Sequence, residues 1–391
     1  MEPRDDHQTP FTLVRAGNVG YTAMMLFARH PTRLSSVLEA EVGFGAADMG
    51  NKGAVGMRTL YSDPDGGEAE LTFVATHLAA MEWNLPRRNA NWAAIMRGLT
   101  FANPEEVLSG EDESEDARLL PRGDDGDEDE GDGQQHARLR RRLHDLSVYK
   151  PSSHLFVAGD LNYRIATTPP PAGAVLPSLD PTSPSHFSVF LPLDQLTRER
   201  RAGRTLHGLV EAPVKFPPTY KYMPMEEGEE EDGGGFFDES GYYEHGDEDD
   251  DEDDDEDTDV VRWRFASHRW PAWTDRILYL DAPPSDPQIE VRAYDALPVV
   301  RTSDHRAVFL RASVPLAPRT GPLSASDPRR RLPVEIDPEA WARRMAARRK
   351  ERVLGWTLLL WGSREGGWVL LLALVVGLSG WYWGFYRVSE T

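Results

Sequence analysis

Six side chains in four short sequence blocks offer the carboxylate, amide and imidazole groups that metal-assisted phosphate hydrolysis uses. They are His77 in THLAA, Asp160 and Asn162 in GDLNYRI, Asp275 in PAWTDRIL, and Asp304 and His305 in TSDHRAV. In such chemistry a carboxylate takes a proton from water, while amide and imidazole donors stabilise the charge that grows on the phosphoryl oxygens. A hard Mg²⁺ ion suits the same oxygen ligands.

The sequence does not support a covalent mechanism or a thiolate metal site. It contains no cysteine, which excludes disulfides and zinc–thiolate clusters, and no serine lies in a nucleophile elbow. Each block alone has a plainer explanation. His77 could be a buried structural histidine, Asp160 and Asn162 could form an Asx turn, and Asp304 with His305 could be a surface pair.

Three of these blocks directly follow short apolar segments that we predict to be strands. Leu71–Ala75 precedes His77, Leu155–Ala158 precedes Asp160, and Val299–Val300 precedes Asp304. Polar residues at strand ends in an α/β sheet converge on one edge, where ligands bind. We therefore expect the six side chains to share one site.

The surrounding elements are predicted to alternate between strands and helices, which favours α/β layers. We expect strands at 54–61 and 70–77 around a turn at 62–67, a helix over 84–101, a helix over 138–146 and a strand at 154–158. Further predictions are a buried strand at 21–29, a helix over 187–204, and strands within 263–280 and 288–310.

Charge is distributed unevenly along the 391 residues, whose formal net charge is −22. Residues 104–133 contain 14 acidic and 2 basic side chains, and residues 226–259 contain 21 acidic side chains and no Lys or Arg. We predict that both runs are disordered insertions. The remainder of the chain is net basic, which suits an anionic substrate or a membrane surface.

The C-terminal end is predicted to be a membrane anchor. Residues 366–386 form a run of 21 residues without a charge, long enough to span a bilayer, with aromatic residues near both ends. Basic residues precede this segment, namely Arg343, Arg344, Arg348, Arg349, Lys350 and Arg352. Only Arg387 follows it, so the rest of the chain is expected to face the cytosol from the endoplasmic reticulum or another endomembrane. The alternative is a buried core helix. We expect residues 315–352 to be a linker and basic juxtamembrane segment, and 353–361 to lie at the membrane interface.

Taken together and in this order, the blocks GNKGAV, THLAA, GDLNYRI, PTYKY, PAWTDRIL and SDHRAV resemble the inositol polyphosphate 5-phosphatases of the endonuclease/exonuclease/phosphatase superfamily. The resemblance extends from about residue 11 to residue 314. It implies a Mg²⁺-dependent monomer with a four-layer α/β sandwich, in which two central mixed β-sheets are flanked by helices. It also implies a phosphoinositide or soluble inositol polyphosphate as substrate.

The resemblance assigns a role to each site residue. Asp160 would orient and deprotonate the attacking water, Asn162 would hold the transferring phosphoryl group, and His77 would donate to its oxygens. Asp304 would orient His305, which would stabilise the transition state, and Asp275 would support the phosphate and metal network. Five further residues match positions that grip other substrate phosphates: Tyr220, Lys221 and Arg269 for the neighbouring ring phosphate, and Asn51 and Lys52 for the phosphate that links ring to lipid.

Two features depart from the family pattern. The position two residues before Arg269 often holds Lys in the family but is Ser267 here. The family also opens with a Trp-Asn-Val-x-Gly block and a Gln-Glu block whose Glu binds the metal, and this sequence contains neither, so the first strands are expected to be lacking. Glu39 and Glu41 lie in a different context and are not assigned as metal ligands.

Two alternatives to a phosphatase therefore stay open. The chain could be a catalytically impaired, membrane-anchored phosphoinositide-binding protein, because the metal-binding Glu is absent. It could also be a nuclease or sphingomyelinase of the same superfamily. Tyr220 and Lys221 argue against that second alternative, and the acidic runs would repel a polynucleotide. We therefore expect no nucleic-acid partner.

Overall fold

The computed structural model describes residues 10–45, 48–109, 138–225, 262–316 and 321–389. The first acidic run begins in the short helix α2 (Pro104–Ser109), and its remainder lies outside the described residues. The whole of the second acidic run also lies outside them. The prediction that these runs are disordered therefore stays a prediction.

A five-stranded mixed sheet forms the centre of the fold, with the order β3-β4-β5-β6-β9. Its strands are β3 (Leu34–Gly43), β4 (Gly53–Ser62), β5 (Glu68–Thr76), β6 (Ser153–Asp160) and β9 (Asp275–Tyr279). Only β5 and β6 pair in parallel, and the other three pairs are antiparallel. The predicted strands at 54–61, 70–77 and 154–158 are confirmed as β4, β5 and β6.

Two different elements cover the two faces of this sheet. A Cβ atom added to Gly56 of β4 would meet Leu99 and Phe101, which follow helix α1 (Leu85–Gly98). A Cβ atom added to Gly17 of β1 would instead meet Val55 and Met57, the residues of β4 that point to the opposite face. The hairpin of β1 (Thr12–Val19) and β2 (Thr22–Ala28) therefore covers the face away from α1.

Helix α1 forms the main hydrophobic core with the sheet. Trp92, Ile95, Met96 and Leu99 recur at helical spacing and are all buried, as the sequence pattern predicts. Pro86 lies in the first turn, where its missing N–H costs nothing. The core continues through Leu155 and Val157 of β6, so the strand that leads to Asp160 is held rigidly.

The expected buried strand at 21–29 is present as β2, but it is not buried. Met25 and Phe27 are 62% and 48% exposed, because only one face of the hairpin packs on the sheet. A continuous apolar run could not distinguish a buried strand from one with a single covered face.

The helix predicted over 187–204 is broken into three pieces. Two 3₁₀ turns, Phe187–Val189 and Leu191–Leu193, precede α4 (Gln195–Arg201). The Asp194 carboxylate accepts a hydrogen bond from the backbone N–H of Thr197 at 2.9 Å and so caps α4. The predicted helix at 138–146 is confirmed.

Two small antiparallel pairs complete the body of the molecule. Strands β7 (Tyr222–Pro224) and β8 (Trp263–Phe265) form one, and β10 (Glu290–Ala296) and β11 (Val308–Ser313) form the other. The backbone N–H of Ile277 in β9 donates to the Tyr294 hydroxyl in β10 at 3.2 Å, which ties the second pair to the central sheet.

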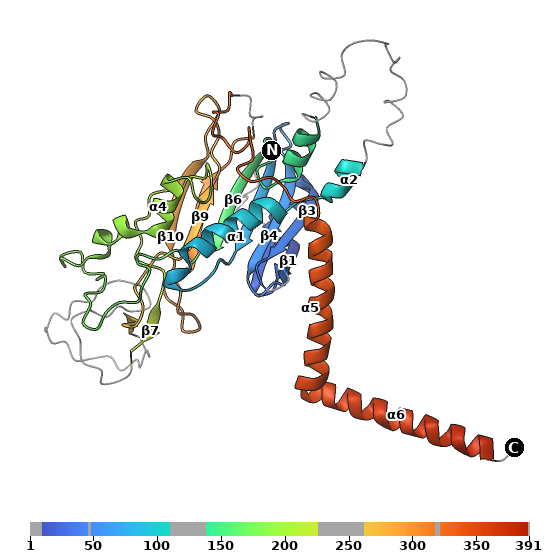
Figure 1. Cartoon of the computed structure of the whole chain (residues 1–391). Coiled ribbons are helices and arrows are strands. Elements are labelled where there is room, and N and C mark those ends of the chain that lie inside the picture. The colour runs from blue at the N-terminus through green and yellow to red at the C-terminus, as the bar shows by residue number, and fades with distance from the viewer. Residues whose placement is uncertain (1–9, 46–47, 110–137, 226–261, 317–320, 390–391) are drawn as a thin grey trace, which may run out of the picture.

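Two long helices end the chain. Helix α5 (Ala340–Gly362) starts beside β3 and extends away from the sheet, and α6 (Arg364–Ser389) continues at a sharp bend (Figure 1). Among the described residues, the segment Arg364–Trp383 of α6 is the one that is long and apolar enough to cross a membrane, and 6% of it is buried. This agrees with the span expected over 366–386.

Candidate active site

Strand polarity brings the candidate residues to one edge of the central sheet. His77 follows the end of β5 and Asp160 ends β6, while Asp275 begins β9 and Lys52 precedes β4. Since β4 and β9 run antiparallel to β5 and β6, the first residues of β4 and β9 lie at the same edge of the sheet as the last residues of β5 and β6. The backbone confirms the alignment, because the N–H of Leu78 donates to the Asp160 carbonyl at 3.0 Å.

Asp160 lies at the centre of the first half of the site. Its Oδ2 is 3.1 Å from Nε2 of His77 and accepts from the Asn162 amide at 2.8 Å, and its Oδ1 accepts from the Asn162 backbone N–H at 3.0 Å. Asn162 has a positive φ of 57°, a conformation that Asn tolerates better than most residues. The ammonium group of Lys52 in turn contacts Nε2 of His77.

Asp275 lies at the centre of the second half. Its Oδ2 is 2.8 Å from Nδ1 of His305 and accepts from the hydroxyls of Thr219 and Thr274, each at 2.8 Å. This set of contacts fixes both the carboxylate and the imidazole ring. Asp160 and Asp275 are register partners across β6 and β9, so the two halves form one site.

The carboxylate that orients His305 is not the expected one. We expected Asp304 to fill this role, but its Oδ1 is 3.9 Å from Nε2 of His305. Its other oxygen accepts from Nζ of Lys221 at 2.7 Å. Adjacent residues on an extended chain point to opposite sides, so a neighbour in sequence is poorly placed to reach the ring, whereas β9 brings Asp275 directly to it.

Arg164 is a site residue that the sequence analysis did not assign. Its guanidinium contacts the side-chain oxygen of Asn162, and its Nε donates to the Asn162 carbonyl at 3.2 Å. Its Cζ lies 4.3 Å from the ring centre of Tyr220, whose ring is 4.6 Å from that of His305. Arg164 therefore joins the two halves. It lies within the GDLNYRI block, so the motif itself was the available signal.

The remaining predicted residues occupy different positions. Tyr220 and Lys221 lie beside His305 and Asp304. Nη1 of Arg269 donates at 2.6 Å to the carboxylate of Glu82, a residue that is 1% exposed. Asn51 is exposed in the loop before β4. The structure thus gathers the six predicted catalytic residues with Lys52, Tyr220 and Lys221, while Arg269 is engaged with Glu82.

The electrostatics of the site favour an ionised carboxylate beside a protonated imidazole. Burial alone would raise the pKa of Asp160, but the hydrogen bond and charge of His77 lower it overall. Burial alone would lower the pKa of His305, but the Asp275 carboxylate raises it overall. Burial also lowers the pKa of Lys52. The arrangement can therefore place a carboxylate base and a cationic hydrogen-bond donor beside one bound anion.

The donor set tests whether a divalent metal fits. Asp160, Asn162 and Asp304 offer hard oxygens of the kind that Mg²⁺ takes. Within the part of the chain that the structure describes, however, no group of three His, Asp or Glu side chains is placed to hold one ion. The described residues therefore do not form a complete metal cage.

Comparison with protein families gives one match that covers most of the chain. The sequence pattern of endonuclease/exonuclease/phosphatase family 2 matches residues 2–232 and 243–311. This range includes every residue of the site described above.

Comparison with curated proteins gives distant relatives. The chain is 25% identical to inositol-1,4,5-trisphosphate 5-phosphatase 1 of Schizosaccharomyces pombe over 76% of its own length and 19% of the relative. It is 27% identical to human phosphatidylinositol 3,4,5-trisphosphate 5-phosphatase 2 over 73% of its own length and 17% of the relative. The chain thus spans less than a fifth of these proteins.

Two solved structures are also similar. The inositol polyphosphate 5-phosphatase domain of SPsynaptojanin, in complex with inositol (1,4)-bisphosphate and calcium ion, matches with a TM-score of 0.44 at 24% identity. That match covers 77% of this chain and 61% of the other. The human nocturnin catalytic domain matches with a TM-score of 0.25 at 12% identity and covers 78% of this chain and 61% of the other.

Proposed function

The chain belongs to endonuclease/exonuclease/phosphatase family 2, and we propose that it removes the 5-phosphate from phosphoinositides or soluble inositol polyphosphates. One observation carries the proposal. Two carboxylate–imidazole pairs, Asp160 with His77 and Asp275 with His305, meet at one edge of the sheet. The curated relatives are named as 5-phosphatases, which supports the choice of substrate.

In this proposal water attacks phosphorus directly, the bond between phosphorus and the inositol 5-oxygen breaks, and no covalent intermediate forms. The departing 5-oxygen takes up a proton from solvent. Asp160 is ionised at neutral pH and takes a proton from the attacking water. His305, held by Asp275 through Nδ1, presents Nε2 and its positive charge to a phosphoryl oxygen. His77 and Asn162 donate to the remaining oxygens.

Substrate binding rests on the cationic and aromatic groups around this centre. Tyr220 and Lys221 grip a ring phosphate next to the one that leaves, and Lys52 with Asn51 contacts the phosphate that links ring to lipid. Arg269 is part of the same proposal, and Glu82 holds its Nη1. Buried or half-buried cations bind phosphates strongly because little water competes.

We propose Mg²⁺ as the required ion. A Mg²⁺ ion usually takes one or two protein carboxylates and completes its shell with water and substrate phosphate. The described residues alone do not form a complete cage for this ion.

The membrane helix and the fold complete the proposal. Helix α6 anchors the chain in an endomembrane, with the basic residues of α5 and the site on the cytosolic side. The fold proposed for the body is a four-layer sandwich, in which the separate two-stranded sheets β1–β2 and β10–β11 stand in place of the second central sheet. The active form is a monomer that does not bind nucleic acid.

A substrate panel tests the function. The full chain in detergent micelles with Mg²⁺ is expected to release phosphate from phosphatidylinositol 4,5-bisphosphate but not from phosphatidylinositol 4-phosphate. Release from neither lipid, or equal release from both, would contradict the proposal.

A second candidate function is phosphoinositide binding without turnover. The observation that favours it is the absence, among the described residues, of a three-ligand metal group. Saturable binding of phosphatidylinositol 4,5-bisphosphate vesicles without phosphate release would support binding alone.

A further inference from the structure

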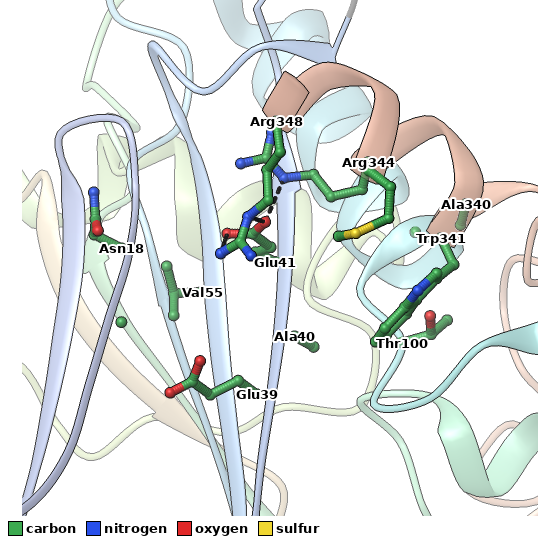
Figure 2. A pocket seen from close by; sticks show the side chains of 13 residues that line it. Asn18, Glu39, Ala40, Glu41, Val55, Thr100, Ala340, Trp341, Arg344 and Arg348 are labelled. Carbon is green, nitrogen blue, oxygen red and sulfur yellow. Dashed lines mark hydrogen bonds and ion pairs between the residues drawn. The ribbon is translucent and has the colours of Figure 1, made fainter. Parts of the chain in front are cut away.

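The loop that carries Asn51 and Lys52 is held by a helix from the far end of the sequence. Residues 48–52 lead into β4, and Glu351 in the middle of α5 binds their backbone at Gly50. Figure 2 shows Arg344 and Arg348 of α5 reaching towards Glu41 of β3. The helix and the loop are far apart in the sequence: Asp48 and Arg344, which are in contact, are 296 residues apart.

Arg344 forms the centre of these contacts. Its Nε donates to Oε1 of Glu41 and its Nη1 donates to Oε1 of Glu351, each at 2.8 Å. Nη2 of Arg348 donates to the second Glu41 oxygen at 2.9 Å. The side chain of Arg344 is only 7% exposed, so water screens these pairs weakly.

Two of the contacts reach the loop backbone itself. Oε1 of Glu351 accepts a hydrogen bond from the backbone N–H of Gly50 at 2.6 Å, and Nη1 of Arg344 donates to the Asp48 carbonyl at 3.3 Å. A carboxylate that binds a backbone N–H makes a charge-assisted bond, which is stronger than a neutral one. We call Glu41, Arg344 and Glu351 the α5 clamp.

The opposite side of the loop is blocked by the β1–β2 turn. A Cβ atom added to Gly20 would lie 1.2 Å from the carbonyl oxygen of Gly50, so the two backbones are in direct contact. The loop is thus confined between this turn and α5. Its last residue, Lys52, directs its ammonium group to His77, which binds Asp160.

Packing beneath the clamp is incomplete. A cavity of about 160 Å³ lies between the β1–β2 hairpin, the central sheet and α5, and its lining includes Asn18, Val55 and Trp341 (Figure 2). Two small side chains of α5, Ala340 and Ala347, are buried, and the first of them lines this cavity. The polar contacts of the clamp therefore add to a small apolar contact in holding the helix on the loop.

We propose that Arg344 and Glu351 are positioning residues of the active site, which act by fixing the backbone of residues 48–52 and thereby the place of Lys52. Because α6 follows α5 directly, the clamp makes the juxtamembrane helix part of the site's scaffold. The kinetic part of this proposal rests on the phosphatase function above. The structural part does not depend on it.

Hydrogen–deuterium exchange tests the structural part with the full chain in detergent micelles. In Glu351→Ala, the amides of residues 48–52 are expected to exchange at least about tenfold faster than in the wild type, because Gly50 loses a charged acceptor. Glu351→Gln retains a neutral acceptor, so its exchange should lie between the two. Arg349→Gln is the matched control, since Arg349 is an exposed residue of the same helix.

Kinetics with a soluble inositol trisphosphate test the positioning role, because this substrate does not depend on delivery by a membrane. Glu351→Ala is expected to lower kcat/KM about tenfold, with Glu351→Gln restoring part of it and Arg349→Gln unchanged. In a Lys52→Ala background the same substitution should have no further effect, since its influence passes through Lys52.

The outcomes separate the two proposals. Unchanged exchange in Glu351→Ala would overturn the clamp whether or not the protein has activity. If Glu351→Ala exchanges faster but lowers kcat/KM by the same factor in the Lys52→Ala background as in the wild type, its effect does not pass through Lys52, and that part of the proposal is wrong. A wild type that releases no phosphate but shows faster exchange in Glu351→Ala would contradict the phosphatase function and leave the clamp standing.

Discussion

Asp160 and Asp275 face each other as register partners at the end of the β6–β9 ladder, and each carboxylate binds a different histidine. The first pair, with His77, carries a carboxylate whose pKa is lowered. The second pair, with His305, carries an imidazole whose pKa is raised. Environments that drive two pKa values apart are typical of an acid and a base with separate tasks.

Removing the charge of Asp160 should abolish most activity without unfolding the protein. In Asp160→Asn the amide cannot take a proton from water, so kcat is expected to fall by about 10²- to 10⁴-fold. Phosphate release at saturating substrate measures this, and circular dichroism checks the fold. Full activity in a correctly folded variant would remove Asp160 from the mechanism.

The pH dependence of kcat/KM should report His305. A raised pKa means that the charged imidazole persists above the ordinary value of 6.5 and is lost as pH rises further. The pKa of Asp160 is lowered from its ordinary value of 3.8, so its carboxylate stays ionised throughout the pH range of the measurement. Between pH 5 and 9 the profile should therefore show one falling limb, on the alkaline side of 6.5.

Asp275→Asn provides the check on that assignment. Without the Asp275 charge the pKa of His305 falls, so the falling limb should move to lower pH. Asp304→Asn is the comparison, because Asp304 lies farther from the ring and binds Lys221. An equal shift of the falling limb in both variants would contradict the assignment of Asp275 as the main cause of the raised pKa of His305.

Lys221 should contribute to recognition of a ring phosphate beside the scissile one. Lys221→Met is expected to raise KM about tenfold for inositol 1,4,5-trisphosphate but to change it little for a substrate without the 4-phosphate. Lys215→Met, which removes an exposed lysine, is the control. A similar rise in KM for both substrates would contradict contact with the 4-phosphate.

How much could be predicted from the sequence differs between parts of the molecule. The helical spacing of Trp92, Ile95 and Met96 predicted α1 correctly, and the apolar runs predicted β5 and β6, because these elements obey local periodicity. The exposure of β2 and the break of the 187–204 segment depend on what packs against them, which local periodicity does not encode.

The candidate site shows the same division. The positions of His77 and Asp160 directly after predicted strands indicated that they would meet, since the ends of neighbouring parallel strands lie at one edge of a sheet. The partner of His305 could not be predicted from its neighbour Asp304, because the hydrogen bond comes from β9, thirty residues away (|i−j| = 30). The contact between α5 and Gly50 is likewise a product of tertiary packing that no short motif contains.

Metal removal should stop the reaction. Incubation with EDTA is expected to abolish phosphate release, and added Mg²⁺ should restore it, because Mg²⁺ is the ion that we propose for the site and hard oxygen ligands favour it. Binding of inositol 1,4-bisphosphate by calorimetry, with and without EDTA, distinguishes a catalytic effect from a loss of fold. Turnover that persists in EDTA would contradict a metal requirement.

Gly159 should be essential to both stability and the site, because it lies where β6 passes the end of β5. Its φ is +138°, and an added Cβ would lie 2.0 Å from the carbonyl oxygen of Thr76. Gly159→Ala must therefore push apart the strand ends that carry His77 and Asp160. We expect it to cost at least about 3 kcal/mol of stability, together with most of the activity.

Gly173→Ala is the matched control for that prediction. Gly173 also has a positive φ, of +73°, but an added Cβ there has nothing within 4 Å. Only backbone strain opposes this substitution, so it should cost about 1 kcal/mol and leave kcat unchanged. Thermal melting of the full chain in detergent micelles measures both variants. Equal losses in the two would show that strain alone, and not the contact with Thr76, makes Gly159 necessary.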